Sequence, residues 1–171
     1  ELPVVINSGS GNQGMTCSLP VLEYAKELHT NEDKTYRALA LSNLIAIHQK
    51  TGIGRLSAYC GAVSAGAAAG AGIAYLCGGG YEEVIHTVVN ALAIVSGMVC
   101  DGAKASCAAK IAASVDAGIL GYNMYLQGQQ FYAGDGIITK GIEGTIDNVG
   151  RLGKDGMKET NEEIIRIMIN D

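Results

Sequence analysis

The chain has 171 residues, of which 48% are apolar and 17% charged, so it can bury a core and is not disordered. With 24 glycines, 2 prolines and 5% aromatic residues, it suits close-packed helices better than a turn-rich all-β protein. A net charge of −5, without a basic stripe, argues against a nucleic-acid partner.

The first expected element is a short apolar strand or strand-like segment at residues 4–7. A loop of glycine and small polar residues follows at 8–14, and helical spacing begins near Ser18, where Pro20 suits a first turn. Because the start of a helix attracts anions, this Gly-rich loop could receive a substrate carboxylate. It has neither the lysine of a P-loop nor the Rossmann glycine spacing, and the alternative is a simple flexible turn.

Helical spacing continues through most of the chain, and residues 132–150 form a glycine-punctuated segment with a possible short strand or loop at 137–139. No repeat or linker divides the pattern. The sequence predicts a mainly α fold: a single helical domain of close-packed Ala/Gly-rich helices with a Gly-rich substrate loop near the N-terminus. The expected helices cover residues 18–29, 35–50, 57–76, 81–96, 102–127 and 156–169.

The nearly uncharged stretch 61–80 raises the alternative of a membrane span with small-residue contacts. It is mostly alanine and glycine, which gain little from entering lipid, so we expect no membrane association. Five cysteines, an odd number in a chain without a recognisable signal peptide, favour reduced thiols and a cytoplasmic location. The chain opens on Glu1 and an apolar run, which suggests the C-terminal part of a longer protein, although a processed start would look the same.

Three cysteines, Cys60, Cys100 and Cys107, fall near expected helix ends. On one straight helix, Cys100 and Cys107 would be separated by about 10 Å of rise, too far for one metal ion. Neighbouring glycines instead place Cys100 in a loop that can fold toward Cys107. Three thiolates from three element ends could hold an iron–sulfur cube and leave its fourth iron open. The alternatives are ordinary buried cysteines and a zinc site, for which the usual CxxC pair is missing.

Three sequence blocks resemble the iron–sulfur L-serine dehydratase alpha-chain superfamily, and most closely its L-cysteine desulfidase-like branch. They are SGSGNQG at 8–14, CGAVSAG at 60–66 and GMVCDGAKASC at 97–107. The similarity runs over nearly the whole chain, and the last block is its most specific part. The resemblance implies a 4Fe–4S cluster on Cys60, Cys100 and Cys107. It also implies elimination of hydrogen sulfide or water from L-cysteine or L-serine to give pyruvate and ammonia.

The chain departs from the pattern of iron–sulfur serine dehydratases at two places. Those proteins typically show a histidine shortly before the second cluster cysteine and a proline after the Cys-Asp pair. Here residues 93–96 contain no histidine and Gly102 follows the pair. The departures favour the desulfidase-like branch and leave the substrate open.

The resemblance further implies that residues 1–171 are the C-terminal iron–sulfur catalytic domain of a longer chain. Its partners would be a small amino-acid substrate, the missing N-terminal portion and further copies in a homo-oligomer. Asp101 and Lys104 flank the cluster thiolates and are the candidate catalytic residues. A helix N-cap and a solvated helix charge, respectively, are the alternatives for them. Four loop residues would hold the substrate carboxylate: Ser8, Ser10, Gly11 and Asn12.

Two other functional classes are open from the residues alone. One is a zinc-bearing or cluster-bearing binding module without catalysis. The other is a helical assembly module, whose small-residue faces would complete a larger complex.

Overall fold

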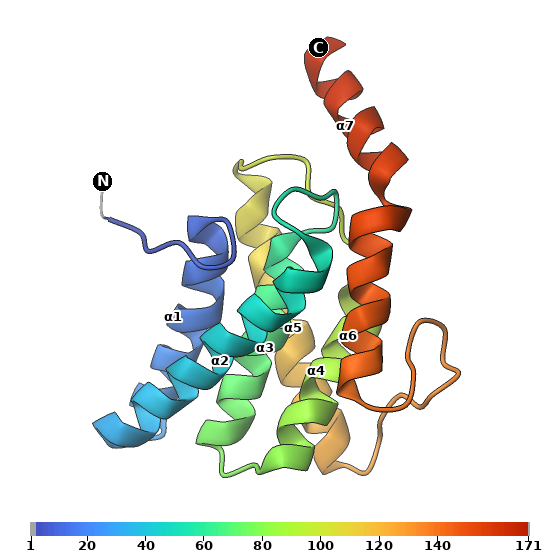
Figure 1. The fold of residues 1–171 in the computed structure, drawn as a ribbon. Coiled ribbons are helices and arrows are strands. Elements are labelled where there is room, and N and C mark those ends of the chain that lie inside the picture. The colour runs from blue at the N-terminus through green and yellow to red at the C-terminus, as the bar shows by residue number, and fades with distance from the viewer. Residues whose placement is uncertain (1–2, 171) are drawn as a thin grey trace.

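The computed structural model describes residues 3–170, and its elements are helices, with the longest connection at residues 127–141 (Figure 1). Within these residues there are no strands, and β-type pairing is limited to the isolated bridges Asn7–Ser10 and Tyr59–Val99. The mainly α, single-domain prediction is confirmed. The elements are α1 (Gly11–Glu27), α2 (Glu32–Ile53), α3 (Gly61–Leu76), α4 (Tyr81–Val95), α5 (Ser106–Leu126), α6 (Ile142–Arg151), the π-helical turn η1 (Leu152–Gly156) and α7 (Lys158–Asn170).

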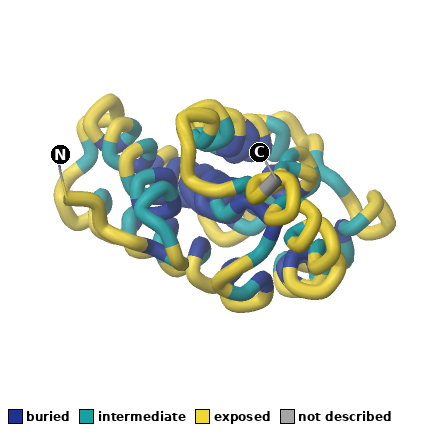
Figure 2. The backbone as a smooth tube through the Cα atoms, turned by 90° about the horizontal axis from the view of Figure 1, so that it is seen from above, coloured by how far each residue is buried: buried dark blue, intermediate teal, exposed yellow. Residues whose placement is uncertain are grey.

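Helix α3 is the centre of the domain, and α1, α2, α4 and α5 pack around it. All of its residues except Gly61 and Tyr75 are buried, as expected for a helix that is apolar on every side. Viewed from above, buried backbone fills the middle and exposed backbone surrounds it (Figure 2).

Helices α3 and α5 approach each other closely enough for their backbones to touch. A Cβ atom added at Gly70 would stand 2.6 Å from the Cα of Gly118, and one added at Gly66 would stand 2.5 Å from backbone atoms of Ser114. Only glycine allows this approach. The predicted close packing of small-residue helices is confirmed here.

The N-terminal region differs from the prediction. Helix α1 begins at Gly11, seven residues earlier than expected, because the Ser10 hydroxyl caps it by accepting from the Gln13 N–H at 3.2 Å. Gly14 belongs to the helix, where an added Cβ would lie 2.0 Å from the Val5 carbonyl oxygen. The Gly-rich loop is therefore not confirmed as predicted, since only residues 8–10 precede the helix. The expected strand at 4–7 is wrong: it has no partner strand, and residues 4–6 are exposed.

Helix α6 falls largely within the glycine-punctuated segment 132–150, for which the sequence predicted only a possible short strand or loop at 137–139. Its buried residues recur at helical spacing, and Gly150 packs against the backbone of Gly52 in α2. The turn η1 continues α6 and holds the segment before α3, because the Ser57 hydroxyl donates to the Gly153 carbonyl at 2.6 Å. The same hydroxyl accepts from the Tyr59 N–H at 2.9 Å.

Helix α7 projects beyond the other helices (Figure 1). Its apolar side chains stay largely accessible, with Ile165 47% and Met168 56% exposed. Among the described residues, no helix combines the length and the apolar character that crossing a membrane requires.

Candidate functional site

A cavity of about 200 Å³ lies where α1, α3 and α5 begin. The three helix starts stand at the same end of the molecule (Figure 1). The N-terminus of a helix carries a partial positive charge and free N–H groups, so three of them favour anionic groups in the space between. The cavity is lined by residues 9, 10, 12, 13, 50, 55–57, 59–62, 100, 102, 103, 107, 110 and 111.

Cys60 and Cys100 are held side by side by backbone pairing between two loops. The Cys60 N–H donates to the Met98 carbonyl at 3.2 Å, and the Cys100 N–H donates to the Ala58 carbonyl at 2.6 Å. Cys60 is the N-cap of α3, whereas Cys100 lies in the connection before α5, as the glycine pattern predicted. Both residues line the cavity.

Cys107 reaches the same cavity from the first turn of α5. Its sulfur lies 3.5 Å from the backbone nitrogen of Lys104 and 3.5 Å from the carbonyl oxygen of Gly102. Gly102 has a φ of +91°, a conformation that favours glycine, and this turn folds the loop back toward the helix. The three sulfur residues from three element ends therefore share one cavity.

Burial raises the pKa of the Cys60 thiol. The N–H of Ala62 at the start of α3 and the charge of Lys110 act in the opposite direction, because both favour the thiolate. A bound cation or metal centre would favour it further, since thiolates rather than thiols are metal ligands.

Lys110 ties the Cys100 loop to α5. Its ammonium group lies 2.5 Å from the Asp101 carboxylate and donates to the Val99 carbonyl at 3.0 Å. Lys104 pairs with the other oxygen of Asp101, also at 2.5 Å. Hydrogen bonds from Lys104 and Lys110 lower the pKa of Asp101 to about 2, so this carboxylate stays ionised.

The predicted catalytic residues thus form an ion-pair cluster beside the cavity. Neither Asp101 nor Lys104 is among the residues that line it, and it is Lys110 that does.

The predicted substrate-binding residues are divided between two adjoining hollows. Ser10 and Asn12 line the cavity, whereas Ser8 lines an outer groove that shares residues 9, 50, 55 and 56 with it. Gly11 lines neither and starts α1, where an added Cβ would come within 2.8 Å of a Val4 methyl.

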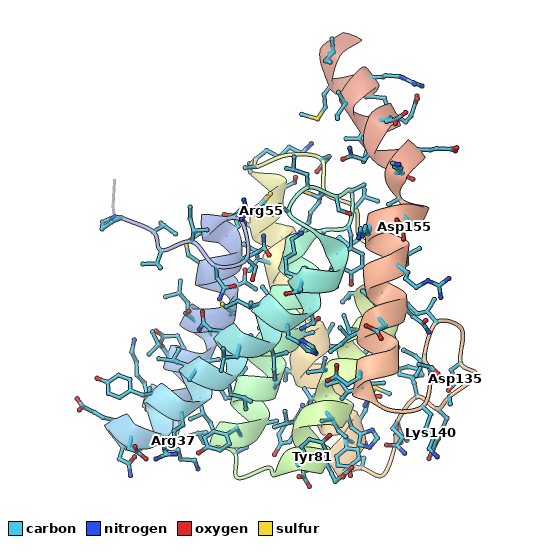
Figure 3. All side chains as sticks on the ribbon, viewed as in Figure 1. Arg37, Arg55, Tyr81, Asp135, Lys140 and Asp155 are labelled. Atoms are coloured by element: carbon cyan, nitrogen blue, oxygen red, sulfur yellow. The ribbon has the colours of Figure 1, made fainter. Side chains whose placement is uncertain are left out.

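Four residues with long polar side chains at the site were not anticipated from the sequence: Gln13, Lys50, Arg55 and Lys110. Lys50 lies in the last turn of α2, where a lysine ordinarily interacts with the helix dipole at the surface. Arg55 extends at the cavity end of the molecule (Figure 3). For Lys110 a signal existed, because it follows Cys107 by three residues and so lies on the same helix face.

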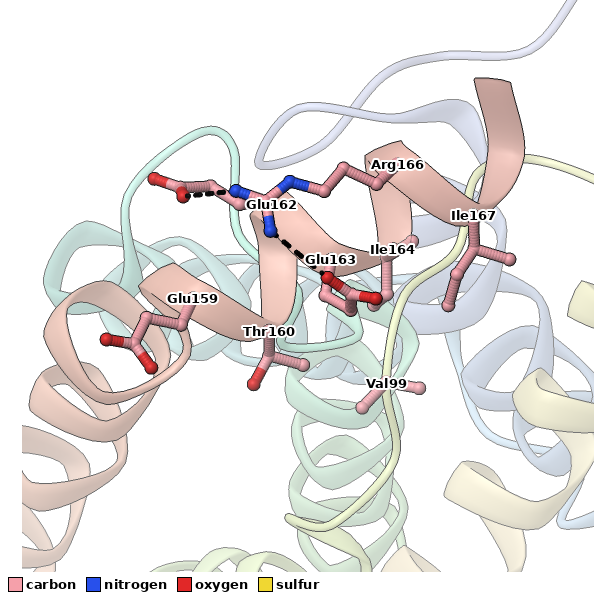
Figure 4. Close-up of a pocket in the computed structure, with 8 residues that line it drawn as sticks. All are labelled: Val99, Glu159, Thr160, Glu162, Glu163, Ile164, Arg166 and Ile167. Atoms are coloured by element: carbon pink, nitrogen blue, oxygen red, sulfur yellow. Dashed lines mark hydrogen bonds and ion pairs between the residues drawn. The ribbon is translucent and has the colours of Figure 1, made fainter. Parts of the chain in front are cut away.

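A separate hollow lies on the surface between α7 and Val99 (Figure 4). Its polar side chains are mainly acidic, and Arg166 is engaged with Glu163 at 3.3 Å and Glu162 at 3.8 Å. No thiol is among the described residues that line it, so the cavity with the three cysteines is the better candidate for a catalytic or metal site.

In the part of the chain that the structure describes, no group of three or more His, Cys, Asp or Glu side chains is arranged to hold one metal ion. A cluster makes a different demand, because each cysteine binds a separate iron and the sulfurs stand apart.

The family of the chain follows from sequence comparison. Residues 1–166 match the serine dehydratase alpha chain family, and the chain belongs to it. A UPF0597 protein of Desulfitobacterium hafniense is 72% identical over 170 residues, covering 99% of this chain and 40% of the relative. UPF0597 proteins of Treponema denticola and Bacteroides fragilis are 53% and 42% identical, covering 99% and 98% of this chain and 39% of each relative. The chain thus spans about two fifths of the length of these relatives. No solved structure matches it significantly.

Proposed function

We propose that the chain carries a 4Fe–4S cluster on Cys60, Cys100 and Cys107 and belongs to a lyase acting on a small β-substituted L-amino acid. The observation that carries the proposal is that these three cysteines line one cavity at three helix starts. Membership in the serine dehydratase alpha chain family supports an elimination reaction.

The residues present fit such a cluster. Thiolate is the usual ligand of iron–sulfur clusters. Burial raises the pKa of the Cys60 thiol, and the Ala62 N–H and the charge of Lys110 oppose this effect by favouring the thiolate. No acidic side chain is found among the described residues that line the cavity, so none opposes an anionic centre there. When bound, a cluster with three cysteine ligands supplies one open iron, a Lewis acid for a departing hydroxyl or thiol.

Ser10 and Asn12 are suited to orient the substrate. The Ser10 oxygen accepts from the backbone N–H of Gln13 at 3.2 Å and from its side-chain amide at 3.1 Å. Its own hydroxyl hydrogen is therefore left to donate into the cavity, and a carboxylate is the acceptor that benefits most. Gly11 is the first residue of α1, and Ser8 lines the outer groove along which the substrate enters.

Asp101 and Lys104 serve as positioning residues in this proposal. The Asp101 carboxylate connects Lys104 and Lys110, which brackets the loop between Cys100 and Cys107. Holding that loop keeps two of the three thiols at a fixed separation.

L-cysteine and L-serine are the proposed substrates. Loss of hydrogen sulfide or water, respectively, would give 2-aminoacrylate, whose imine tautomer takes up one water and releases pyruvate and ammonia. Because the relatives are longer, the complete activity is proposed for the whole protein, in which the portion absent here and further copies of the chain are partners. The cytoplasm is the proposed location.

Anaerobic reconstitution with iron and sulfide tests the cluster. We expect a brown protein with about four irons per chain. Single changes of Cys60, Cys100 or Cys107 to Ala should abolish the colour. Cys77→Ala is the matched control, because Cys77 is exposed and is not among the residues that line the cavity.

Pyruvate release from L-cysteine and L-serine by the reconstituted full-length protein then tests the reaction. Colour that survives the three cavity substitutions but is lost with Cys77→Ala would refute the ligand assignment. Stoichiometric zinc in place of iron would favour a binding module without catalysis.

A further inference from the structure

Lys50 is a lysine whose side chain is enclosed at the wall of the cavity. The residue is only 8% exposed, and it borders both the cavity and the outer groove through which a ligand would enter. Burying an ammonium group is unfavourable unless an opposite charge or hydrogen-bond acceptors compensate for the lost water.

Within the described residues no carboxylate or hydrogen-bond acceptor supplies this compensation, and the ammonium nitrogen itself, which is not among the buried atoms without a partner, keeps contact with solvent. Lys50 forms none of the ion pairs or side-chain hydrogen bonds found there, and none of the residues lining the cavity or the outer groove is acidic. Its two cationic neighbours differ from it. Lys110 is occupied by Asp101 and the Val99 carbonyl, and Arg55 is exposed.

We propose that Lys50 binds the α-carboxylate of the amino-acid substrate and thereby makes the site selective for free amino acids over their amides and esters. This inference rests on the proposed function for the identity of the substrate. Lys50 and Ser10 reach the cavity from α2 and from the start of α1. A carboxylate between them forms an ion pair with the Lys50 ammonium group and accepts a hydrogen bond from the Ser10 hydroxyl.

A rival role for Lys50 is to offset the charge of the thiolates, because Cys60 and Cys100 are close enough to act on it electrostatically. The two roles differ in what they change. A counter-ion for the thiolates affects iron retention, whereas a carboxylate anchor affects the choice between ligands that differ only at the carboxylate.

The experiment compares binding of L-serine and L-serinamide by isothermal titration calorimetry under anaerobic conditions, with the iron content of each preparation measured. The wild-type protein should bind L-serine about tenfold to a hundredfold more tightly than the amide, as expected for a charge-assisted contact. Lys50→Met keeps the length of the side chain and should remove most of this preference. Lys50→Arg should keep part of it.

Lys158→Met is the control, since it removes an exposed charge from α7. In steady-state assays of the full-length protein, Lys50→Met should raise KM by a similar factor while changing kcat less.

The inference is overturned if wild-type protein shows no preference for L-serine, or if Lys50→Met keeps the wild-type preference. It is also overturned if Lys50→Met loses iron that Lys158→Met retains, because the charge would then serve the thiolates. A protein that releases no pyruvate but shows the Lys50-dependent preference would refute the lyase function and leave the carboxylate site standing.

Discussion

Small residues have opposite effects in the middle of the α3–α5 pair and at the N-terminal ends of the same two helices. In the middle, Gly70 meets the backbone of Gly118 and leaves no space for a methyl group. At the ends, Cys60 and Cys107 face a cavity instead of each other's backbone. Glycines that bind no ligand therefore determine where the thiols lie, because they fix the separation of the helices that carry them.

The largest expected effect comes from forcing the tight helix contact apart. Gly70→Ala places a Cβ 2.6 Å from the Gly118 Cα, and the backbone cannot yield as a side chain would. We expect a loss of about 3 kcal/mol in the free energy of unfolding, despite better helix propensity. Urea denaturation measures it. Gly97→Ala is the control, since an added Cβ meets nothing within 4 Å there, and equal stability of the two variants would contradict the close-contact interpretation.

A smaller effect is expected at the other side of α5. Asn90 is fully buried, donates to the Gly121 carbonyl at 3.0 Å and accepts from the Phe131 N–H at 3.1 Å. Asn90→Ala removes both hydrogen bonds and leaves the half-buried Phe131 N–H without this acceptor, which should cost about 2 kcal/mol. Thermal denaturation compares it with Asn123→Ala on the exposed surface of α5. Indistinguishable melting temperatures would show that water replaces the amide without cost.

At the open end, Lys110→Met should loosen the loop without unfolding the helices. The change removes the ion pair to Asp101 and the hydrogen bond to the Val99 carbonyl. We expect faster hydrogen exchange of the Cys100 amide, weaker iron retention and a nearly unchanged melting temperature. Lys140→Met, at an exposed site away from the cavity, is the control. A large drop in melting temperature would show that this end is as tightly coupled to the core as the middle.

The smallest effect concerns reactivity alone. Burial raises the pKa of the Cys17 thiol, and its sulfur contacts the Asn43 side-chain oxygen at 3.3 Å. Because the thiolate is the reactive form, alkylation of Cys17 should require a higher pH than that of an ordinary thiol and should be further blocked by burial. Peptide mass spectrometry after iodoacetamide treatment at about pH 8 should find Cys77 modified and Cys17 intact. Partial burial raises the pKa of the Cys77 thiol as well, so the contrast comes from the exposure of Cys77 and the complete burial of Cys17. In urea both should react, and early modification of Cys17 in the native protein would contradict the described packing.

Much of the fold was predictable because its signals are local. Glycines on both sides of Cys100 interrupt the helical pattern, and the structure indeed places that cysteine in a loop and Cys107 at a helix start. The uncharged Ala/Gly run likewise predicted a closely packed helix, which is α3.

What the sequence did not reveal depends on contacts between distant segments. Gly14 suggested a loop, yet it is glycine because the chain before α1 lies against it. Helix α6 was not recognised because its two glycines are explained by contacts with other segments: Gly144 meets the Thr139 side chain and Gly150 meets the Gly52 backbone. The residues next to Lys50 in the sequence do not indicate that it is buried, because the loops and helix starts that enclose it come from other parts of the chain.

The hydrogen bond from Ser57 to Gly153 determines which truncated fragments of the protein can keep the thiol site. The π-helical turn supplies the acceptor for Ser57 and the backbone against which Tyr59 rests, although both residues precede it by a long stretch of chain. A truncation that removed everything after α6 would spare every cysteine yet withdraw the support beneath Cys60. The shortest fragment able to assemble the thiol site therefore ends after this turn, not after the last thiol.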